Sequence, residues 1–215
     1  MNKLVIFDLD GTLLDSITDI SDNINVMLKK FGYPERKVEE IMQFVGNGAR
    51  KIVERSLPFA VSEEELNERL AFYNDLYTNC GSPKTKVYDG MGETLIALKE
   101  KGYKIAILTN KPQETTNEVY KKYLSEYNFD IVVGQRAEKK TKPDPSTTFE
   151  IINALGASVD STYFVGDGEA DVEVAINAGV KGIAVLWGFR TKDQLLKVGA
   201  KEFVSTPSDL LKVIK

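Results

Sequence analysis

Two pairs of carboxylates stand directly after apolar runs in distant parts of the sequence. Asp8 and Asp10 follow residues 4–7, and Asp167 and Asp171 follow residues 162–165. Because side chains alternate along an extended strand, Asp8 and Asp10 can point to the same side. Open parallel sheets bind their ligands beyond the carboxyl ends of the strands. We therefore expect these acids to share one site.

Further polar residues stand at equivalent places. Thr109 and Asn110 follow the apolar residues 105–108, and Lys142 stands on a loop before an expected helix. Parallel strands bring their carboxyl ends to one edge of a sheet. The topology would therefore assemble Thr109, Asn110 and the carboxylates without their being neighbours in sequence, and Lys142 would arrive from its loop.

Carboxylates that are pressed together raise one another's pKa values, so the site needs a cation. The chain has no histidine and a single cysteine, Cys80, which excludes imidazole-activated nucleophiles, His-ligated metals and thiolate clusters. Oxygen ligands alone favour Mg²⁺, which binds carboxylates together with substrate phosphate and water. The pattern indicates phosphoryl chemistry. At its ordinary pKa of about 3.9, Asp8 is an anionic nucleophile that needs no histidine.

The elements that must position these residues alternate along the chain. Short Val- and Ile-rich runs alternate with amphipathic segments, as in βα units around a buried parallel sheet. We expect strands at residues 3–9, 103–109, 131–133, 162–165, 182–186 and 202–204, and helices at residues 91–101, 112–125, 145–155, 169–178, 192–198 and 208–214. The predicted fold class is α/β, with a doubly wound, Rossmann-like parallel sheet.

An insert interrupts this pattern after the first strand. It holds no convincing strand, whereas apolar residues recur at three- and four-residue spacing from Ile17 to Phe31. Ser62 and Glu65 then form a capping-box pattern before a second apolar helix face. We predict an α-helical cap domain at residues 16–84 and a core domain formed by residues 1–15 and 85–215.

Composition narrows the class of protein. The 215 residues are 42% hydrophobic and 28% charged, with a formal net charge of −4, which is typical of a globular protein and unfavourable for general nucleic-acid binding. The apolar runs are too short for a signal sequence or a membrane span, and one cysteine gives no disulfide within the chain. We expect a cytoplasmic protein without nucleic-acid or membrane partners, and the sequence leaves its oligomeric state open.

The motifs together resemble those of the haloacid dehalogenase superfamily. They span nearly the whole chain: DLDGTL at residues 8–13, Thr109-Asn110, Lys142-Pro143, and Gly166-Asp167 with Asp171. The helical insert is similar to the superfamily's C1 cap. Residues 45–50, 110–112 and 187–188 are similar to phosphoglycolate phosphatase-like members.

The resemblance implies a Mg²⁺-dependent phosphomonoesterase that acts on a small phosphorylated metabolite, with 2-phosphoglycolate as the leading candidate. Asp8 would be phosphorylated on its carboxylate during the reaction. Asp10 would protonate the leaving alcohol and then activate the water that hydrolyses the intermediate.

The resemblance also implies the ligands of the metal and of the phosphate. Mg²⁺ would bind the carboxylates of Asp8 and Asp167 and the backbone carbonyl of Asp10, with Asp171 orienting these ligands. The transferring phosphoryl oxygens would be held by Thr109, Asn110 and Lys142.

Two features of the sequence bear on substrate recognition. In the insert, Gly48 and Arg50 belong to the segment GNGAR at residues 46–50, which is either a loop that reads the leaving group or a plain turn between helices. Lys111 could add positive potential to the site, but its place before Pro112 at an expected helix start favours a solvated side chain.

The sequence is compatible with other functions. A sugar-phosphate mutase and a pyrophosphatase are alternatives to this phosphatase. Mutases similar to β-phosphoglucomutase carry Glu-Asp where this chain has Gly166-Asp167, so the metal motif is more similar to that of the phosphatases. A non-catalytic binding protein on the same fold would have no need of Asp8, Asp10, Lys142 and Asp167 together.

Overall fold

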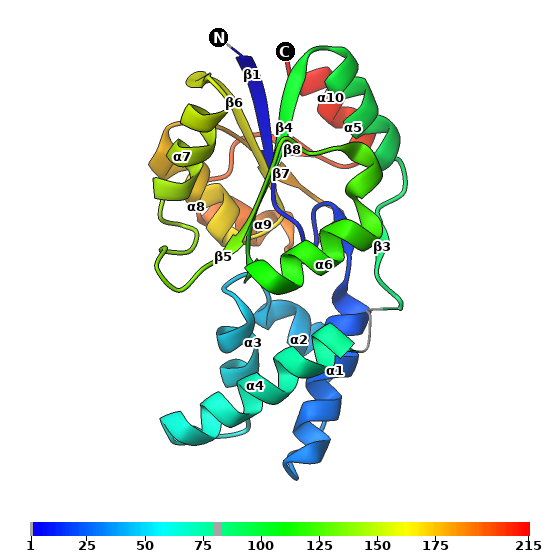
Figure 1. Cartoon of the computed structure of the whole chain (residues 1–215), viewed down its shortest axis with the longest axis vertical. Helices are drawn as coiled ribbons and strands as arrows, with labels where there is room; N and C mark the ends of the chain where they lie inside the picture. Colours follow the sequence, from blue (N-terminus) through cyan, green and yellow to red (C-terminus); the bar gives the residue numbers. More distant parts are fainter. Residues whose placement is uncertain (1, 80–82) are drawn as a thin grey trace.

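A six-stranded parallel sheet forms the centre of the computed structural model, which describes residues 2–79 and 83–215. Its strand order is β5-β4-β1-β6-β7-β8 (Figure 1). The strands are β1 (Asn2–Phe7), β4 (Tyr103–Pro112), β5 (Ile131–Gln135), β6 (Ala157–Gly166), β7 (Lys181–Val185) and β8 (Phe203–Val204). Cys80 and residues 81–82, near the predicted end of the insert, lie outside the described residues.

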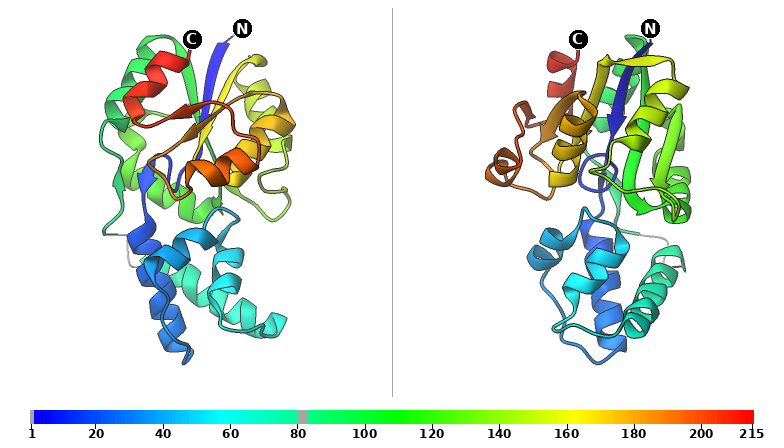
Figure 2. Two further views of the ribbon diagram at one scale, coloured as in Figure 1. Left: turned by 180° about the vertical axis from the view of Figure 1, so that it is seen from behind. Right: turned by 90° about the vertical axis from the view of Figure 1, so that its left-hand side faces the viewer.

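Alternating residues of the strands fill a core on each face of the sheet. Val5 and Phe7 of β1 point to one face, which α5 (Met91–Glu100), α6 (Gln113–Tyr123) and α10 (Leu210–Val213) cover. Leu4 and Ile6 point to the other face, which α7 (Ser146–Ala154) and α8 (Glu169–Ala178) cover. The short helix α9 (Lys192–Lys197) packs beside β7. Helices on both faces of a parallel sheet, visible in Figure 2, confirm the doubly wound α/β fold.

The central strand β1 lies between β4 and β6, and their registers match. Phe7, the last residue of β1, pairs with Ile107 of β4 and with Val165 of β6. The residues that follow these three positions therefore reach the same edge of the sheet. Strand β4 is longer than the sequence predicts and continues to Pro112, whose partner is Gln135.

In the described residues, the insert forms the helices α1 to α4, which lie beyond the carboxyl ends of the strands (Figure 1). They are α1 (Ile17–Lys30), α2 (Val38–Phe44), α3 (Ala49–Ser56) and α4 (Glu63–Asn79), which confirms a helical insert after the first strand. An antiparallel pair that the sequence did not predict, β2 (Leu14–Asp15) and β3 (Lys86–Val87), flanks them. The domain division at residues 16–84 stays a prediction.

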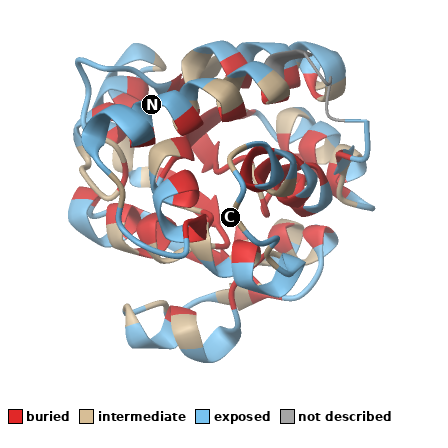
Figure 3. Cartoon of the chain, turned by 90° about the horizontal axis from the view of Figure 1, so that it is seen from below, coloured by how far each residue is buried: buried red, intermediate tan, exposed pale blue. Residues whose placement is uncertain are grey.

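The helices of the insert bury one side and expose the other. Ile20, Ile24 and Met27 of α1 are at most 1% exposed, and Figure 3 shows buried and exposed positions alternating around the helices. In the described part of the chain, none of the helices combines the length and the apolar content needed to cross a bilayer. The cytoplasmic location stays a prediction.

Candidate active site

Three buried carboxylates converge at the edge where β1 and β6 end. Asp8 follows β1, and its N–H donates to the Val165 carbonyl over 2.9 Å. Asp167 follows β6, and Asp171 lies in the first turn of α8. Oxygen atoms of the three carboxylates lie within 4.8 Å of one another. The structure thus brings together three of the residues that the sequence selects, from segments about 160 positions apart.

Hydrogen bonds fix the orientation of Asp167. Its carboxylate accepts from the Thr12 hydroxyl over 2.9 Å and from the Phe189 N–H over 2.8 Å. A side chain at Gly11 or Gly188 would not fit beside it, since a Cβ built at either position lies 2.3 Å from an atom of Asp167. The backbone can approach the carboxylate so closely only because these positions are glycine.

Lys142 places an ammonium group between two of the carboxylates. Its Nζ lies 2.7 Å from Asp8 Oδ1 and 2.6 Å from Asp171 Oδ1, and its side chain is 2% exposed. Burial opposes the charged form of Lys142, but the attraction of Asp171 and Asp8 outweighs it and raises the pKa of the amine. Lys142 is therefore a fixed positive charge of the site.

One ammonium does not neutralise three buried carboxylates. Burial, with the charge of Asp171 added, raises the pKa of Asp8 to about 7 in spite of Lys142. Burial and the charges of Asp171 and Asp8 raise the pKa of Asp167 to about 8. The sequence-based expectation that Asp8 is ionised at its ordinary pKa therefore requires a cation at the site. A compact set of carboxylate oxygens with excess negative charge fits Mg²⁺.

The Asp10 carboxylate stands apart from this group and is paired with Lys111. Asp10 Oδ2 lies 3.0 Å from Lys111 Nζ, and Asp10 Oδ1 accepts from the Ser16 hydroxyl over 2.7 Å. Lys111 Nζ also lies 4.0 Å from the centre of the Tyr77 ring. The expectation of a solvated Lys111 is wrong, because β4 runs on to Pro112 and directs this side chain into the interior.

Thr109 and Asn110 lie side by side near the end of β4. The Thr109 hydroxyl accepts from the Lys111 N–H over 3.2 Å. Asn110 Oδ1 accepts from the Lys142 N–H over 2.9 Å, and its Nδ2 donates to the carbonyls of Gly46 (2.9 Å) and Lys142 (3.1 Å). Asn110 therefore holds the Lys142 loop and connects it to the insert.

A cavity between the insert and the sheet opens onto these residues. The core lines it with Asp8, Asp10, Thr109, Asn110, Lys111, Pro112 and Thr115, and the insert lines it with Ile20, Val45, Gly46, Gly48, Ala49, Ile52, Tyr73, Asn74 and Tyr77. Among these described lining residues, Lys111 is the only cation. The cavity therefore combines an acidic end at Asp8, an apolar wall from the insert and one ammonium group.

The two insert residues selected from the sequence lie in different surroundings. Gly48 lines the cavity, at the start of α3. Arg50 does not line it, because its guanidinium pairs with Glu63 and donates to Asn67 Oδ1 over 2.7 Å, both on α4. A role for Arg50 in reading the leaving group stays a prediction that this geometry does not favour.

Sequence reasoning gave no role to two side chains that hold the site together. Thr12, whose only signal was its place inside DLDGTL, binds Asp167. Arg190 connects the core to the insert through backbone carbonyls. No residue pattern signals Arg190, because carbonyl acceptors carry no side-chain identity.

The sequence matches the model of the haloacid dehalogenase-like hydrolase family over residues 5–185. The chain belongs to this family, and with it to the hydrolytic enzymes.

Within the family, the chain is similar to phosphoglycolate phosphatases. It is 34% identical to phosphoglycolate phosphatase 1 of Pseudomonas aeruginosa over 192 residues, which cover 87% of this chain and 70% of the relative. It is 31% identical to the phosphoglycolate phosphatase of Aquifex aeolicus over 99% of this chain and 96% of the relative. The crystal structure of a predicted phosphoglycolate phosphatase from Haemophilus somnus superposes with a TM-score of 0.91 at 26% identity, covering 100% of this chain and 98% of that one.

Proposed function

We propose that this protein is a Mg²⁺-dependent phosphomonoesterase that hydrolyses a small organophosphate with an anionic leaving group, with 2-phosphoglycolate as the first candidate. The observation that carries the proposal is the buried group of Asp8, Asp167 and Asp171, with Lys142 between Asp8 and Asp171. Carboxylates with a fixed ammonium suit the binding of a divalent cation and a phosphoryl group. The similarity to phosphoglycolate phosphatases supports the same reaction.

The chemistry proceeds in two steps on the residues of this chain. A carboxylate oxygen of Asp8 attacks phosphorus and the bond between phosphorus and the ester oxygen breaks. Asp10, which takes up a proton from solvent before this step, gives it to the leaving alcohol. Asp10 then takes a proton from a water molecule, which attacks the phosphorus of the acyl phosphate. This second step releases inorganic phosphate and restores the Asp8 carboxylate.

The metal ligands in this proposal are the carboxylates of Asp8 and Asp167 and the backbone carbonyl of Asp10. Asp171, which accepts from the Gly168 N–H over 2.9 Å and pairs with Lys142, orients this set. Bound Mg²⁺ supplies positive charge for the carboxylates and for the phosphoryl oxygens. Thr109 and Lys142 hold the phosphoryl group, and Asn110, whose side-chain amide binds the Lys142 N–H and two carbonyls, keeps the Lys142 loop in place for it.

Lys111 is the group that favours an anionic leaving group. It is buried in the cavity, and the attraction of Asp10 outweighs burial and raises the pKa of its amine. A carboxylate on the substrate can share this ammonium with Asp10. A leaving group that is a neutral sugar alcohol gains less binding free energy from the buried ammonium of Lys111.

The test is phosphate release with Mg²⁺ and with EDTA, across 2-phosphoglycolate, glycerol phosphate, hexose phosphates, pyrophosphate and p-nitrophenyl phosphate. We expect turnover with Mg²⁺ only and the highest kcat/KM for 2-phosphoglycolate. Asp8→Asn serves as the blank, and Asp160→Asn, at an exposed position in the first half of β6, is the matched control. Interconversion of hexose phosphates without release points to a mutase, and highest activity on pyrophosphate points to a pyrophosphatase. If none of these compounds is turned over, the proposal is contradicted.

A further inference from the structure

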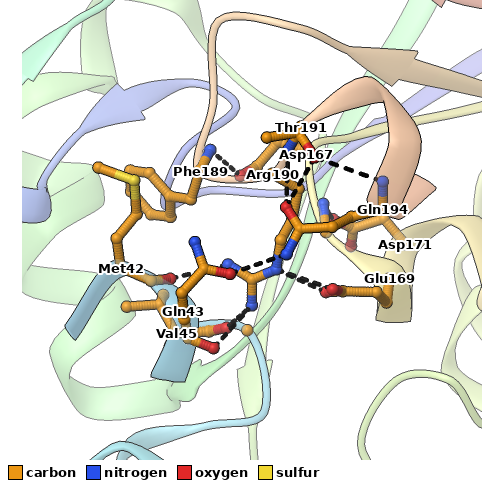
Figure 4. Close-up of polar contacts among 12 residues, drawn as sticks. Met42, Gln43, Val45, Asp167, Glu169, Asp171, Phe189, Arg190, Thr191 and Gln194 are labelled. Carbon is orange, nitrogen blue, oxygen red and sulfur yellow. Dashed lines mark hydrogen bonds and ion pairs between the residues drawn. The ribbon is translucent and has the colours of Figure 1, made fainter. Parts of the chain in front are cut away.

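One buried arginine of the core extends into the insert. Arg190 lies in the β7–α9 loop, which we define as residues 186–191, and its side chain is 5% exposed. Figure 4 shows its guanidinium between α8 on one side and the end of α2 on the other. Nothing in the phosphatase mechanism above uses this residue.

On the insert side, Arg190 binds only backbone carbonyls. Nη1 donates to Met42 over 2.7 Å, and Nη2 donates to Gln43 over 3.2 Å and to Val45 over 2.7 Å (Figure 4). These carbonyls lie at the end of α2, where a helix offers no partner of its own. The planar guanidinium fork is suited to several acceptors at once, which a single ammonium is not.

On the core side, the same loop contacts the carboxylate group. Arg190 Nε donates to both Glu169 oxygens over 2.9 and 2.8 Å, and Glu169 is the first residue of α8, the helix that carries Asp171. The preceding residue, Phe189, donates its N–H to Asp167. Two adjacent residues therefore bind the carboxylate group and the insert, respectively.

The chain segment whose carbonyls Arg190 binds forms part of the wall of the cavity. Val45, Gly46 and Gly48 line it, and the Gly46 carbonyl also accepts from Asn110 Nδ2. Arg190 and Asn110 thus fix this segment from two directions. Because Arg190 and Asn110 both belong to the core, their hydrogen bonds fix the distance between this wall and the end of β4.

We propose that Arg190 is a positioning residue that holds the Val45–Gly48 wall against the core, so that a small substrate is enclosed with its ester oxygen at Asp10. The expected effect of Arg190 on catalysis rests on the proposed function. Its expected effect on the position of the Val45–Gly48 wall rests on the structure alone. Misplacement of a substrate by about 1 Å can lower a rate by about 100-fold, and a small substrate has few other contacts to correct it.

The variants are Arg190→Met, Arg190→Lys and the control Gln43→Ala. Arg190→Met removes the guanidinium group but keeps an apolar side chain of similar length. Arg190→Lys keeps the positive charge but lacks the planar guanidinium group. Gln43→Ala removes the exposed hydrogen bond from Gln194 Nε2 to Gln43 Oε1, which also joins core and insert, and leaves the carbonyls to Arg190.

The first measurement is amide hydrogen exchange of the full chain with Mg²⁺ and inorganic phosphate. We expect Arg190→Met to accelerate exchange over residues 42–52 by about tenfold or more, Arg190→Lys to do so less, and Gln43→Ala to leave it unchanged. Peptides of α4 and β1 are the internal reference. Unchanged exchange at residues 42–52, or equal acceleration in α4 and β1, would overturn the inference.

The second measurement is a kinetic comparison of two substrates. We expect Arg190→Met to lower kcat/KM by about 100-fold for 2-phosphoglycolate and by clearly less for the larger p-nitrophenyl phosphate, at unchanged Mg²⁺ affinity. Equal losses for both substrates would overturn the positioning role. If the wild type hydrolyses no phosphate ester, the proposed function fails, whereas the exchange measurement still decides the inference.

Discussion

Replacing Asp8 by Asn should make the metal-free protein more stable while abolishing its activity. Asn keeps the approximate shape of the side chain and removes its charge. In the metal-free site, burial and the charge of Asp171 raise the pKa of Asp8 to about 7, so its ionised form is disfavoured. Catalytic groups held in such surroundings reduce the stability of the fold that carries them.

The size of the gain follows from the shift in pKa. A rise from 3.8 to about 7 is roughly three units, which at about 1.36 kcal/mol per unit sets an upper value of about 4 kcal/mol. We expect about 1–3 kcal/mol, because the amide of Asn offers one oxygen acceptor where the carboxyl of Asp8 offers two beside Lys142. The stabilisation due to a carboxyl whose pKa is raised on folding is complete below its unfolded pKa and is lost as the pH rises through the folded value. The advantage of Asp8→Asn should therefore be small near pH 4 and full near pH 8.

The assay is urea unfolding followed by circular dichroism in EDTA, at about pH 4 and about pH 8. With Mg²⁺ added, the wild type should be more stable to urea than Asp8→Asn, because the wild type gains more stability from binding the ion than the variant does. Asp160→Asn, far from the site, should match the wild type at both values of pH. A variant that is less stable than the wild type in EDTA at the higher pH, or a difference that does not grow with pH, refutes this charge balance.

Three further substitutions test separate contacts. Lys142→Met leaves Asp8 and Asp171 without their ammonium and should lower metal-free stability by about 3–5 kcal/mol in urea unfolding, and an unchanged stability contradicts the ion pairs. Lys111→Met should lower kcat/KM for 2-phosphoglycolate by about 10- to 100-fold more than for p-nitrophenyl phosphate; equal losses mean that Lys111 does not bind the leaving group. Gly188→Ala places a Cβ 2.3 Å from Asp167 and should weaken Mg²⁺ binding by about tenfold or more in calorimetry, while wild-type affinity argues against the close packing.

The sheet and the carboxylate group follow from local sequence patterns. Buried parallel strands read as continuous apolar runs, which identified β1, β4, β5, β6 and β7. The polar residue after each of three such runs then reaches one edge, because parallel strands end on the same side. This topology brings Asp8 and Asp167 together without any signal from the residues between them.

The contacts between the insert and the core could not be predicted from local sequence patterns. Strands β2 and β3 have two residues each and show no periodicity. Lys111 is buried because β4 runs past Asn110, whereas Pro112 indicated a helix start. The bond from Arg190 to the Val45 carbonyl joins positions 145 residues apart and involves a backbone acceptor, which no residue type marks. Arg50 looked suited to the site by its type, but Glu63 and Asn67 hold it on the outside.

The most direct test of the central claim is mass spectrometry of the protein after acid quenching during turnover of 2-phosphoglycolate with Mg²⁺. The account predicts one phosphoryl group on the peptide that contains Asp8, absent in EDTA and absent in Asp8→Asn. A phosphoryl group on another residue, or turnover without any phosphorylated Asp8, would contradict the assignment of Asp8 as the nucleophile.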